Sequence, residues 1–291
     1  MKQLLILSGK GGTGKTTLAG AFIKLADARA YADCDVDAPN LHLIMDQSSE
    51  PKRTGYCGLP KAEIDTQLCV QCDLCRNYCR FDAIKNHHEY QVDGYACEGC
   101  GVCQAVCPVN AVSLKPAVDG ELRLYSDGSR VFSTAQLKMG SGTSGMLVTE
   151  VKRQMRSVIV DGKLAVIDGS PGIGCPVIAS ISGVDMVLIV AEPSISGVSD
   201  MERIIKTAQT FQTKMAVCIN KYDINPEKTQ KIKLFCQGRG IPIVGRIPFD
   251  AEAVKAVNNG QAIVDLDCAS GRAAREVYDQ TIKILFNNIA L

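Results

Sequence analysis

The chain contains no tryptophan, and aromatic residues make up only 5% of its 291 positions. An excess of positive charge is also missing, because 32 basic and 31 acidic residues leave a formal net charge of +1. Proteins that bind nucleic acid use many basic residues against the phosphates, and those that bind single strands stack aromatic side chains on the bases. The composition therefore argues against nucleic acid as a partner.

Uncharged apolar runs of transmembrane length are missing as well. A helix needs about 20 apolar residues to cross a bilayer, so we expect no stable membrane insertion. Met1 to Leu7 has the pattern of a strand and not of an export signal. Because disulfides do not persist in reducing compartments, a chain with 14 cysteines and no such signal is expected in the cytoplasm.

Eight of these cysteines form two runs with the same spacing, C-x2-C-x2-C-x3-C. In bacterial ferredoxins with two [4Fe–4S] clusters, the fourth cysteine of each run ligates the other cluster. The pattern therefore predicts two ligand sets of four thiolates. The first set is Cys69, Cys72, Cys75 and Cys107, and the second is Cys97, Cys100, Cys103 and Cys79.

Zinc sites and disulfides are the alternatives for these cysteines. Structural zinc usually takes its ligands as two separated pairs, whereas each run here supplies four in close succession. Disulfides are disfavoured by the expected compartment. Pro108 follows the second run, as the ferredoxin pattern expects, whereas Arg80 follows the first. Arg80 leaves the ligands unchanged and could contact an acidic partner.

A glycine-rich segment, KGGTGKTT, covers residues 10–17. It follows the apolar run Leu4 to Leu7 and precedes the helical pattern Leu18 to Ala26, which is the context of a phosphate-binding loop. We expect Lys15 to reach the β- and γ-phosphates of ATP and the Thr16 hydroxyl to bind Mg²⁺. The expected nucleotide-binding residues of the loop are Gly11, Gly12, Thr13, Gly14, Lys15, Thr16 and Thr17.

The additional lysine at position 10 makes this loop resemble that of the MinD/ParA family of deviant Walker A ATPases, which has the pattern KGGxGK[ST]. In that family the first lysine reaches the nucleotide of the other subunit. The resemblance therefore implies that Lys10 acts in an ATP-dependent dimer. Taken alone, Lys10 could equally be a solvated loop lysine.

Two further segments extend the resemblance. Asp33 and Asp35 follow a short strand expected at 29–32 and resemble the family's Asp-x-Asp segment in switch I. The resemblance implies that Asp35 orients or activates the attacking water and that Asp33 supports the Mg²⁺ shell. The apolar strand 164–167 ends at Asp168, which is expected to hold Mg²⁺ through water. Gly172 would then sense the γ-phosphate, as the family's switch II glycine does. The catalytic residues expected are thus Lys10, Lys15 and Asp35.

Two segments are candidates for the adenine site. Asn220 follows the strand expected at 215–219, and its amide could read the edge of the base or cap the next turn. Pro248 belongs to a segment resembling the one that lines the other side of the base. Cys175, just after switch II, could share a metal across a dimer or be a small buried residue.

Strands and helices alternate along the chain, which predicts an α/β fold with a mostly parallel, doubly wound sheet. We expect a P-loop ATPase domain over residues 1–54 and 117–291, interrupted by a ferredoxin-like α+β domain at 55–116. Residues 47–54 are expected to be a linker. A β-hairpin is expected around Asp127 and Gly128, and residues 275–291 are expected to form a core helix and not a membrane anchor.

Over its full length the sequence resembles MinD-type ATPases that carry an inserted ferredoxin domain. This implies ATP or ADP, Mg²⁺ and two [4Fe–4S] clusters as cofactors, and slow Mg²⁺-dependent hydrolysis in the absence of a partner. The implied partners are a second copy or a related ATPase, and a redox or metal–sulfur client. The function is then electron transfer to that client or its maturation. The alternative is a non-catalytic electron carrier or positioning protein with a structural or regulatory nucleotide.

Overall fold

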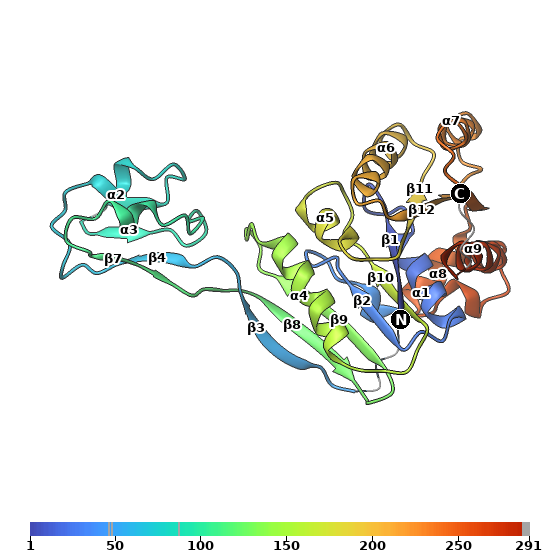
Figure 1. Ribbon diagram of the computed structural model, residues 1–291, viewed down its shortest axis with the longest axis horizontal. Coiled ribbons are helices and arrows are strands. Elements are labelled where there is room, and N and C mark those ends of the chain that lie inside the picture. Colours follow the sequence, from blue (N-terminus) through green and yellow to red (C-terminus); the bar gives the residue numbers. More distant parts are fainter. Residues whose placement is uncertain (46, 48, 87, 287–291) are drawn as a thin grey trace.

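The computed structural model describes residues 1–45, 47, 49–86 and 88–286. In this part of the chain, nine strands form one sheet in the order β13-β12-β11-β1-β10-β2-β9-β8-β3 (Figure 1). The strands are β1 (Lys2–Leu7), β2 (Ala30–Asp33), β3 (Lys52–Cys57), β8 (Val118–Ser126), β9 (Val131–Leu137), β10 (Leu164–Asp168), β11 (Met186–Ala191), β12 (Lys214–Asn220) and β13 (Ile243–Ile247).

The first seven strands in this order are parallel to one another. Beyond them, β8 pairs antiparallel with β9, and β3 pairs antiparallel with β8. The central strands β1, β10 and β11 are almost entirely buried and apolar, as expected for parallel strands covered on both faces. The predicted α/β fold with a mostly parallel sheet is therefore confirmed.

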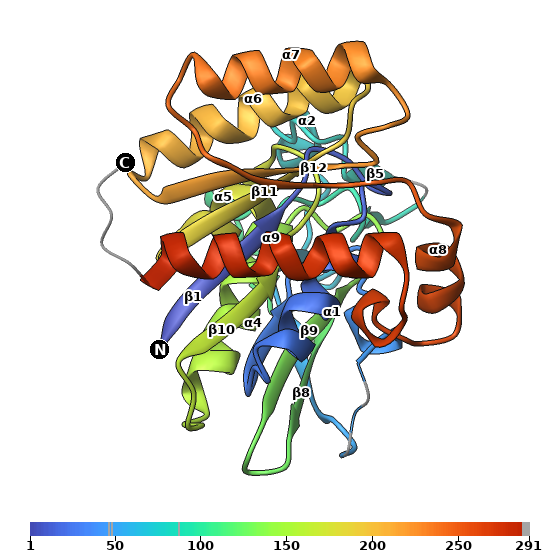
Figure 2. The same cartoon turned by 90° about the vertical axis from the view of Figure 1, so that its right-hand side faces the viewer.

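Helices cover both faces of the sheet. In Figure 2, α9 crosses in front of the strands, whereas α6 and α7 lie above them. One buried cluster contains residues of α4 to α7, and the other contains residues of α1, α8 and α9. The helices are α1 (Lys15–Leu25), η1 (Leu41–Leu43), α4 (Ser144–Ser157), α5 (Cys175–Ile181), α6 (Ile195–Thr210), α7 (Pro226–Gln237), α8 (Ala251–Asn258), η2 (Ile263–Asp265) and α9 (Ala269–Phe286).

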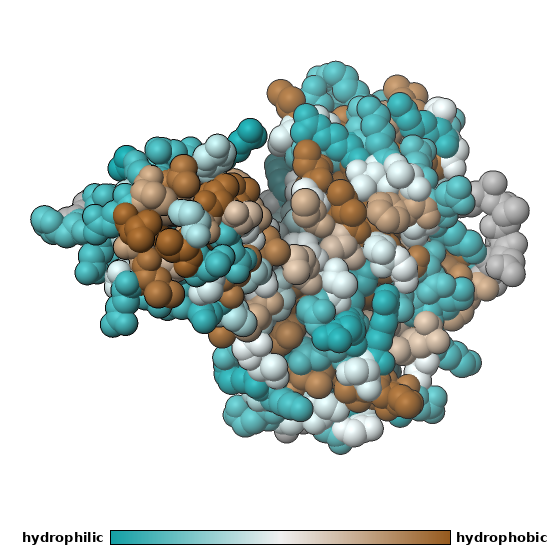
Figure 3. Space-filling view, turned by 60° about the vertical axis from the view of Figure 1, so that its left-hand side comes forward, coloured by the Kyte–Doolittle hydropathy of each residue, from teal (hydrophilic) through white to brown (hydrophobic). Residues whose placement is uncertain are grey.

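Residues 58–117 form a projection that we call the cysteine arm. It leaves the sheet from the end of β3 and returns at the start of β8 (Figure 1). Hydrophobic side chains gather on its surface (Figure 3), and Leu68, Val70 and Tyr95 are more than half exposed. Its elements are β4 (Lys61–Ile64), α2 (Leu74–Asn77), β5 (Ile84–Asn86), β6 (Tyr90–Val92), α3 (Val102–Ala105) and β7 (Val112–Lys115).

Three local predictions can be compared with the structure. The hairpin around Asp127 and Gly128 is confirmed as β8 and β9. The linker at 47–54 is wrong for residues 52–54, which begin β3 because β8 offers them a free edge to pair with. The core helix at the end of the chain is confirmed as far as Phe286, whereas residues 287–291 lie outside the described part. No helix among the described residues is both long and apolar enough to span a membrane.

Candidate functional site

The glycine-rich loop joins β1 to α1 at the carboxyl edge of the sheet, where ligands of open α/β sheets bind. Gly12 and Gly14 have positive φ angles of 77° and 89°, which residues with a Cβ rarely adopt. At Gly14 a Cβ atom would also overlap the side-chain amide of Asn220. Glycine is therefore required at position 14 both for its backbone conformation and for space.

Lys15, Thr16 and Asp168 form one buried group at the start of α1. The Lys15 ammonium lies 2.6 Å from one carboxylate oxygen of Asp168, and the Thr16 hydroxyl donates to the other at 2.6 Å. Burial opposes the charge of Lys15, but the carboxylates of Asp168 and Asp33 raise its pKa. The three predicted phosphate and Mg²⁺ residues are thus brought together.

Asp33 and Asp35 follow β2 beside this group. The Asp33 carboxylate accepts backbone N–H bonds from Asp35, Asn40 and Leu41 at 2.9–3.0 Å, so it holds the shape of the switch I loop. Burial and the neighbouring Asp168 raise the pKa of Asp33 to about 7. Asp35 lines the cavity over the phosphate loop, and burial raises its pKa as well.

Thr13 and Gly172 differ in whether their polar groups are already paired within the protein. The buried Thr13 hydroxyl lines the cavity, and in the described part of the chain it has no hydrogen-bond partner. A bound polar ligand would satisfy such a group. The Gly172 N–H instead donates to the Ser8 carbonyl at 3.1 Å, and Gly172 has a φ of 98°. The predicted γ-phosphate sensor is therefore bound to the base of the phosphate loop here.

Lys10 is held within its own chain. Its ammonium lies 2.9 Å from a carboxylate oxygen of Glu192 and donates to the Ser194 hydroxyl at 3.1 Å. Glu192 also pairs with Lys221 at 3.1 Å, and Lys221 donates to the Gly12 carbonyl at 3.0 Å. This network ties the phosphate loop to the ends of β11 and β12.

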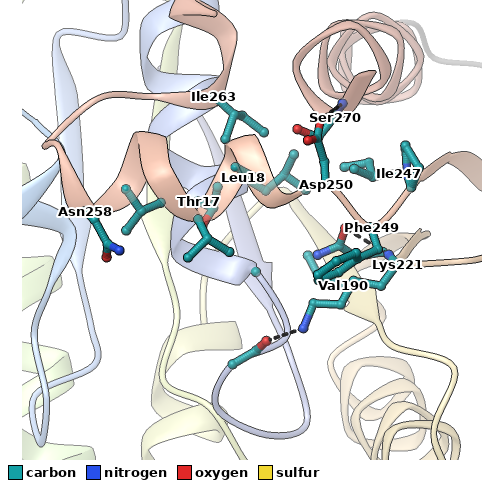
Figure 4. Close-up of a pocket in the computed structure, with 17 residues that line it drawn as sticks. Thr17, Leu18, Val190, Lys221, Ile247, Phe249, Asp250, Asn258, Ile263 and Ser270 are labelled. Atoms are coloured by element: carbon teal, nitrogen blue, oxygen red, sulfur yellow. Dashed lines mark hydrogen bonds between the residues drawn. The ribbon is translucent and has the colours of Figure 1, made fainter. Parts of the chain in front are cut away.

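A second, mostly apolar cavity, drawn in Figure 4, adjoins the first and shares Gly12, Gly14 and Asn258 with it. Asn220 and Pro248 both line it. The Asn220 amide donates to the Thr13 carbonyl at 2.7 Å, and its oxygen accepts from the N–H of Lys221 at 3.0 Å. Both ends of this amide are therefore engaged by protein. The amide thus holds the phosphate loop and the N–H of the next residue, whereas base recognition by Asn220 stays a prediction.

Phe249 belongs to the predicted segment around Pro248, lines the apolar cavity and is 53% exposed. Two residues with a clear place in the site, Asn258 and Glu192, were not among the sequence predictions. Asn258 lines both cavities and stands at the opposite end of the apolar one from Ile247 (Figure 4). For Phe249, the sequence signal was the resemblance of the segment around Pro248. Nothing local in the sequence marks Asn258 or Glu192, because both come to the site through tertiary packing.

In the cysteine arm, the eight cysteines of the two runs gather around two small cavities. Each cavity takes three cysteines from one run and the fourth cysteine from the other. One is lined by Cys69, Cys72, Cys75 and Cys107, and the other by Cys79, Cys97, Cys100 and Cys103.

Backbone N–H groups approach one sulfur at each cavity. The N–H of Ala111 donates to Cys107 Sγ at 3.2 Å, and that of Ala62 donates to Cys97 Sγ at 3.5 Å. Among the described residues, no group of three or more His, Cys, Asp or Glu could hold a metal ion. A cubane cluster binds one thiolate at each of four irons, so its ligands need not converge on one point. The donor set fits such a cluster better than a zinc ion.

Cys175 lies at the first turn of α5 and is exposed. The interpretation of Cys175 as a small buried residue is therefore wrong, because the helix begins at the surface beside the nucleotide site. Sharing a metal across a dimer stays a prediction.

Comparison with known proteins identifies the family. The family described as the CobQ/CobB/MinD/ParA nucleotide binding domain matches residues 4–263. The chain belongs to this family. An uncharacterized protein of Methanocaldococcus jannaschii is 29% identical over 283 residues, covering 96% of this chain and 95% of that protein. An uncharacterized ATP-binding protein of the same organism is 25% identical over 280 residues, covering 94% and 85%.

Two further similarities concern the fold and a shorter part of the chain. The cell division ATPase MinD of Pyrococcus furiosus has a TM-score of 0.57 at 16% identity, covering 97% of this chain and 99% of that one, which shows a shared fold. Pyruvate synthase subunit PorD of Methanothermobacter marburgensis is 34% identical over 68 residues, which is 23% of this chain and 82% of that subunit. The CobQ/CobB/MinD/ParA match accounts for the nucleotide site, and its members include ATPases.

Proposed function

We propose that this member of the CobQ/CobB/MinD/ParA family is a Mg²⁺-dependent ATPase whose dimer switch is coupled to two [4Fe–4S] clusters in the cysteine arm. It delivers electrons to a metal–sulfur protein or assists the maturation of that protein. The observation that carries the proposal is the pair of cavities, each lined by four cysteines, on an arm of a nucleotide-binding fold.

The nucleotide half of the proposal assigns a task to each residue at the phosphate cavity. Lys15 binds the phosphates, and Thr16 and Asp168 hold Mg²⁺ directly or through water. To take up these tasks, Lys15 and Asp168 would have to leave each other, because their charges now neutralise each other at 2.6 Å. Asp35 orients the attacking water. Gly172 leaves the Ser8 carbonyl and donates its N–H to the γ-phosphate.

The part of the proposal that concerns the arm assigns its cysteines as cluster ligands, within the ferredoxin-like domain expected at residues 55–116. Cys69, Cys72, Cys75 and Cys107 would hold one cluster, and Cys97, Cys100, Cys103 and Cys79 the other. When bound, the clusters supply the capacity to accept and release single electrons. The N–H groups of Ala62 and Ala111 would stabilise thiolate charge at the two sites.

Iron and acid-labile sulfide analysis of the anaerobically purified full chain tests the arm half. We expect about eight iron atoms per chain for two cubane clusters. The variants Cys72→Ser and Cys100→Ser should each lose about half of the iron. Cys57→Ser is the matched control, because Cys57 is exposed and lines neither cavity. Full iron content in both site variants would contradict the ligand assignment.

ATP hydrolysis by the same preparation tests the nucleotide half. We expect slow hydrolysis that requires Mg²⁺ and is abolished by Lys15→Ala. A rate that does not depend on Mg²⁺ would contradict the assignment of Thr16 and Asp168.

A further inference from the structure

The two cysteine cavities lie at different distances along the arm from the nucleotide-binding sheet. The register of β4 and β7 fixes their order, because Lys61 pairs with Lys115 near the sheet and Ile64 pairs with Val112 farther out. Ala62 and Leu114 line the cavity of Cys79, Cys97, Cys100 and Cys103, which we call the root site. Ile64 and Val112 line the cavity of Cys69, Cys72, Cys75 and Cys107, which we call the tip site.

The root site lies close to a loop of the nucleotide-binding part, residues 138–143 between β9 and α4. A Cβ atom added to Gly142 would lie 3.4 Å from a carboxylate oxygen of Glu98, and one added to Gly140 would lie 3.8 Å from the ring of Tyr95. Tyr95 and Glu98 flank Cys97. In the described part of the chain, the hydrogen bonds of both runs, residues 69–79 and 97–107, stay within the arm. The two sites therefore differ only in the approach of Tyr95 and Glu98 to this loop.

The same loop connects directly to switch I. Immediately before it, the Leu137 N–H donates to the Val36 carbonyl at 2.8 Å, and the Gln136 amide donates to the Asp37 carbonyl at 3.2 Å. Val36 and Asp37 are the two residues that follow Asp35. These bonds join switch I to the end of β9, immediately before the 138–143 loop.

The other end of the 138–143 loop leads to the helix that follows switch II. The loop continues into α4, which packs against α5. From α4, Lys152 donates to the carbonyls of Ala179, Ser180 and Ser182 at the end of α5, at 3.0, 2.6 and 2.6 Å. The two ends of this short segment are thus joined to the two switch regions, and the segment lies close to the root site.

We propose that the 138–143 loop makes the root site the nucleotide-responsive one of the two cluster sites, with Tyr95 and Glu98 as positioning residues, while the tip site is left unchanged. This inference rests on the proposed function. Cluster properties depend on nearby charge, hydrogen bonds and solvent. A shift of the loop moves the Glu98 carboxylate, which lies between Cys97 and Cys100, and it alters the cover over the root site.

Hydrogen–deuterium exchange on the full chain with its clusters bound tests this difference. Exchange is compared without nucleotide and with Mg²⁺ and a non-hydrolysable ATP analogue. We expect a change of at least about threefold in the exchange rate of residues 94–101, and no change in residues 67–75. Tyr95→Ala and Glu98→Gln should abolish the change at 94–101 while nucleotide still protects the phosphate loop.

Two matched variants control for loss of an exposed side chain of the same type in the arm. Tyr78→Ala removes a tyrosine of the first run that is 58% exposed, and Glu63→Gln neutralises an exposed carboxylate on β4. Both should retain the response at 94–101. An equal response of the two segments, or a response that survives in Tyr95→Ala and Glu98→Gln, would overturn the inference while about eight iron atoms per chain still support the proposed function. A chain without iron would overturn both.

Discussion

The Lys10 ammonium and a Glu192 carboxylate oxygen lie 2.9 Å apart within one chain. In the MinD/ParA family that this loop resembles, the corresponding lysine serves the nucleotide of the other subunit. If Lys10 acts in that way here, it must first leave Glu192. Burial alone would raise the pKa of Glu192, but the contacts from Lys10 and Lys221 lower it, so the carboxylate is charged and the pair opposes release of Lys10.

Neutralising this carboxylate should favour the dimer. Partly exposed ion pairs contribute about 0.2–1 kcal/mol, so Glu192→Gln should tighten ATP-dependent dimerisation by up to about fivefold. Sedimentation velocity over a concentration series, with and without ATP, measures the effect. Lys10→Ala should prevent the ATP-dependent dimer in either background. Weaker dimerisation of Glu192→Gln would show that Glu192 supports the dimer and does not restrain Lys10.

Asp35 should be needed for hydrolysis and not for binding. Its carboxyl group lines the phosphate cavity but does not contact Lys15, Thr16 or Asp168 among the described interactions. Loss of a positioned base or water-orienting group typically slows a reaction by about 10²–10⁴-fold. Asp35→Ala should therefore show this decrease in kcat with little change in ATP affinity. Hydrolysis at the wild-type rate would remove Asp35 from the mechanism.

The Asn220 side chain should contribute equally to the binding of every nucleoside triphosphate. Its amide supports the Thr13 carbonyl and leaves little capacity to read a base. Asn220→Ala should weaken ATP and GTP binding by the same factor, on the order of tenfold, as expected for about 1 kcal/mol or more per hydrogen bond. Equilibrium titration with both nucleotides measures this. A selective loss of ATP binding would instead favour base recognition.

Lys152 should make the stability depend on pH. Burial lowers its pKa to about 8 from 10.5. Between pH 8 and pH 10.5, Lys152 has released its proton in the folded chain but still binds it in the unfolded chain. The contribution of Lys152 to the unfolding free energy therefore increases as pH rises over this range. Lys152→Met leaves three carbonyls without this donor, and we expect a loss on the order of 3 kcal/mol.

Denaturant unfolding of both proteins between pH 7 and pH 10 measures this effect. The unfolding free energy of the wild type minus that of Lys152→Met should grow above pH 8. A difference that does not grow between pH 8 and pH 10 would mean that Lys152 stays charged in the folded chain over this range.

The motifs that lie within short segments could be predicted from the sequence. The loop at 10–17, the strand ending at Asp168 and the hairpin around Gly128 each depend on neighbouring residues, and the structure has all three. The pairing of β3 with β8 and the contact of Glu192 with Lys10 join residues more than 60 positions apart. Such pairings depend on the packed sheet, and the residues at either end carry no local mark of them.

The grouping of the cysteines is an intermediate case. The duplicated spacing predicted which four thiolates belong together, and the cavities in the arm bring the same sets together. Which set lies nearer the nucleotide depends on the register of β4 and β7, which the spacing does not encode.

The measurement that tests the coupling of nucleotide to the clusters most directly is a redox titration of the anaerobic full chain, with and without Mg²⁺ and a non-hydrolysable ATP analogue. If nucleotide affinity depends on the oxidation state of a cluster, its midpoint potential shifts by about 59 mV for each tenfold change in affinity. We expect a shift of one of the two potentials by several tens of millivolts. Two potentials that coincide with and without nucleotide would contradict coupling in the isolated protein.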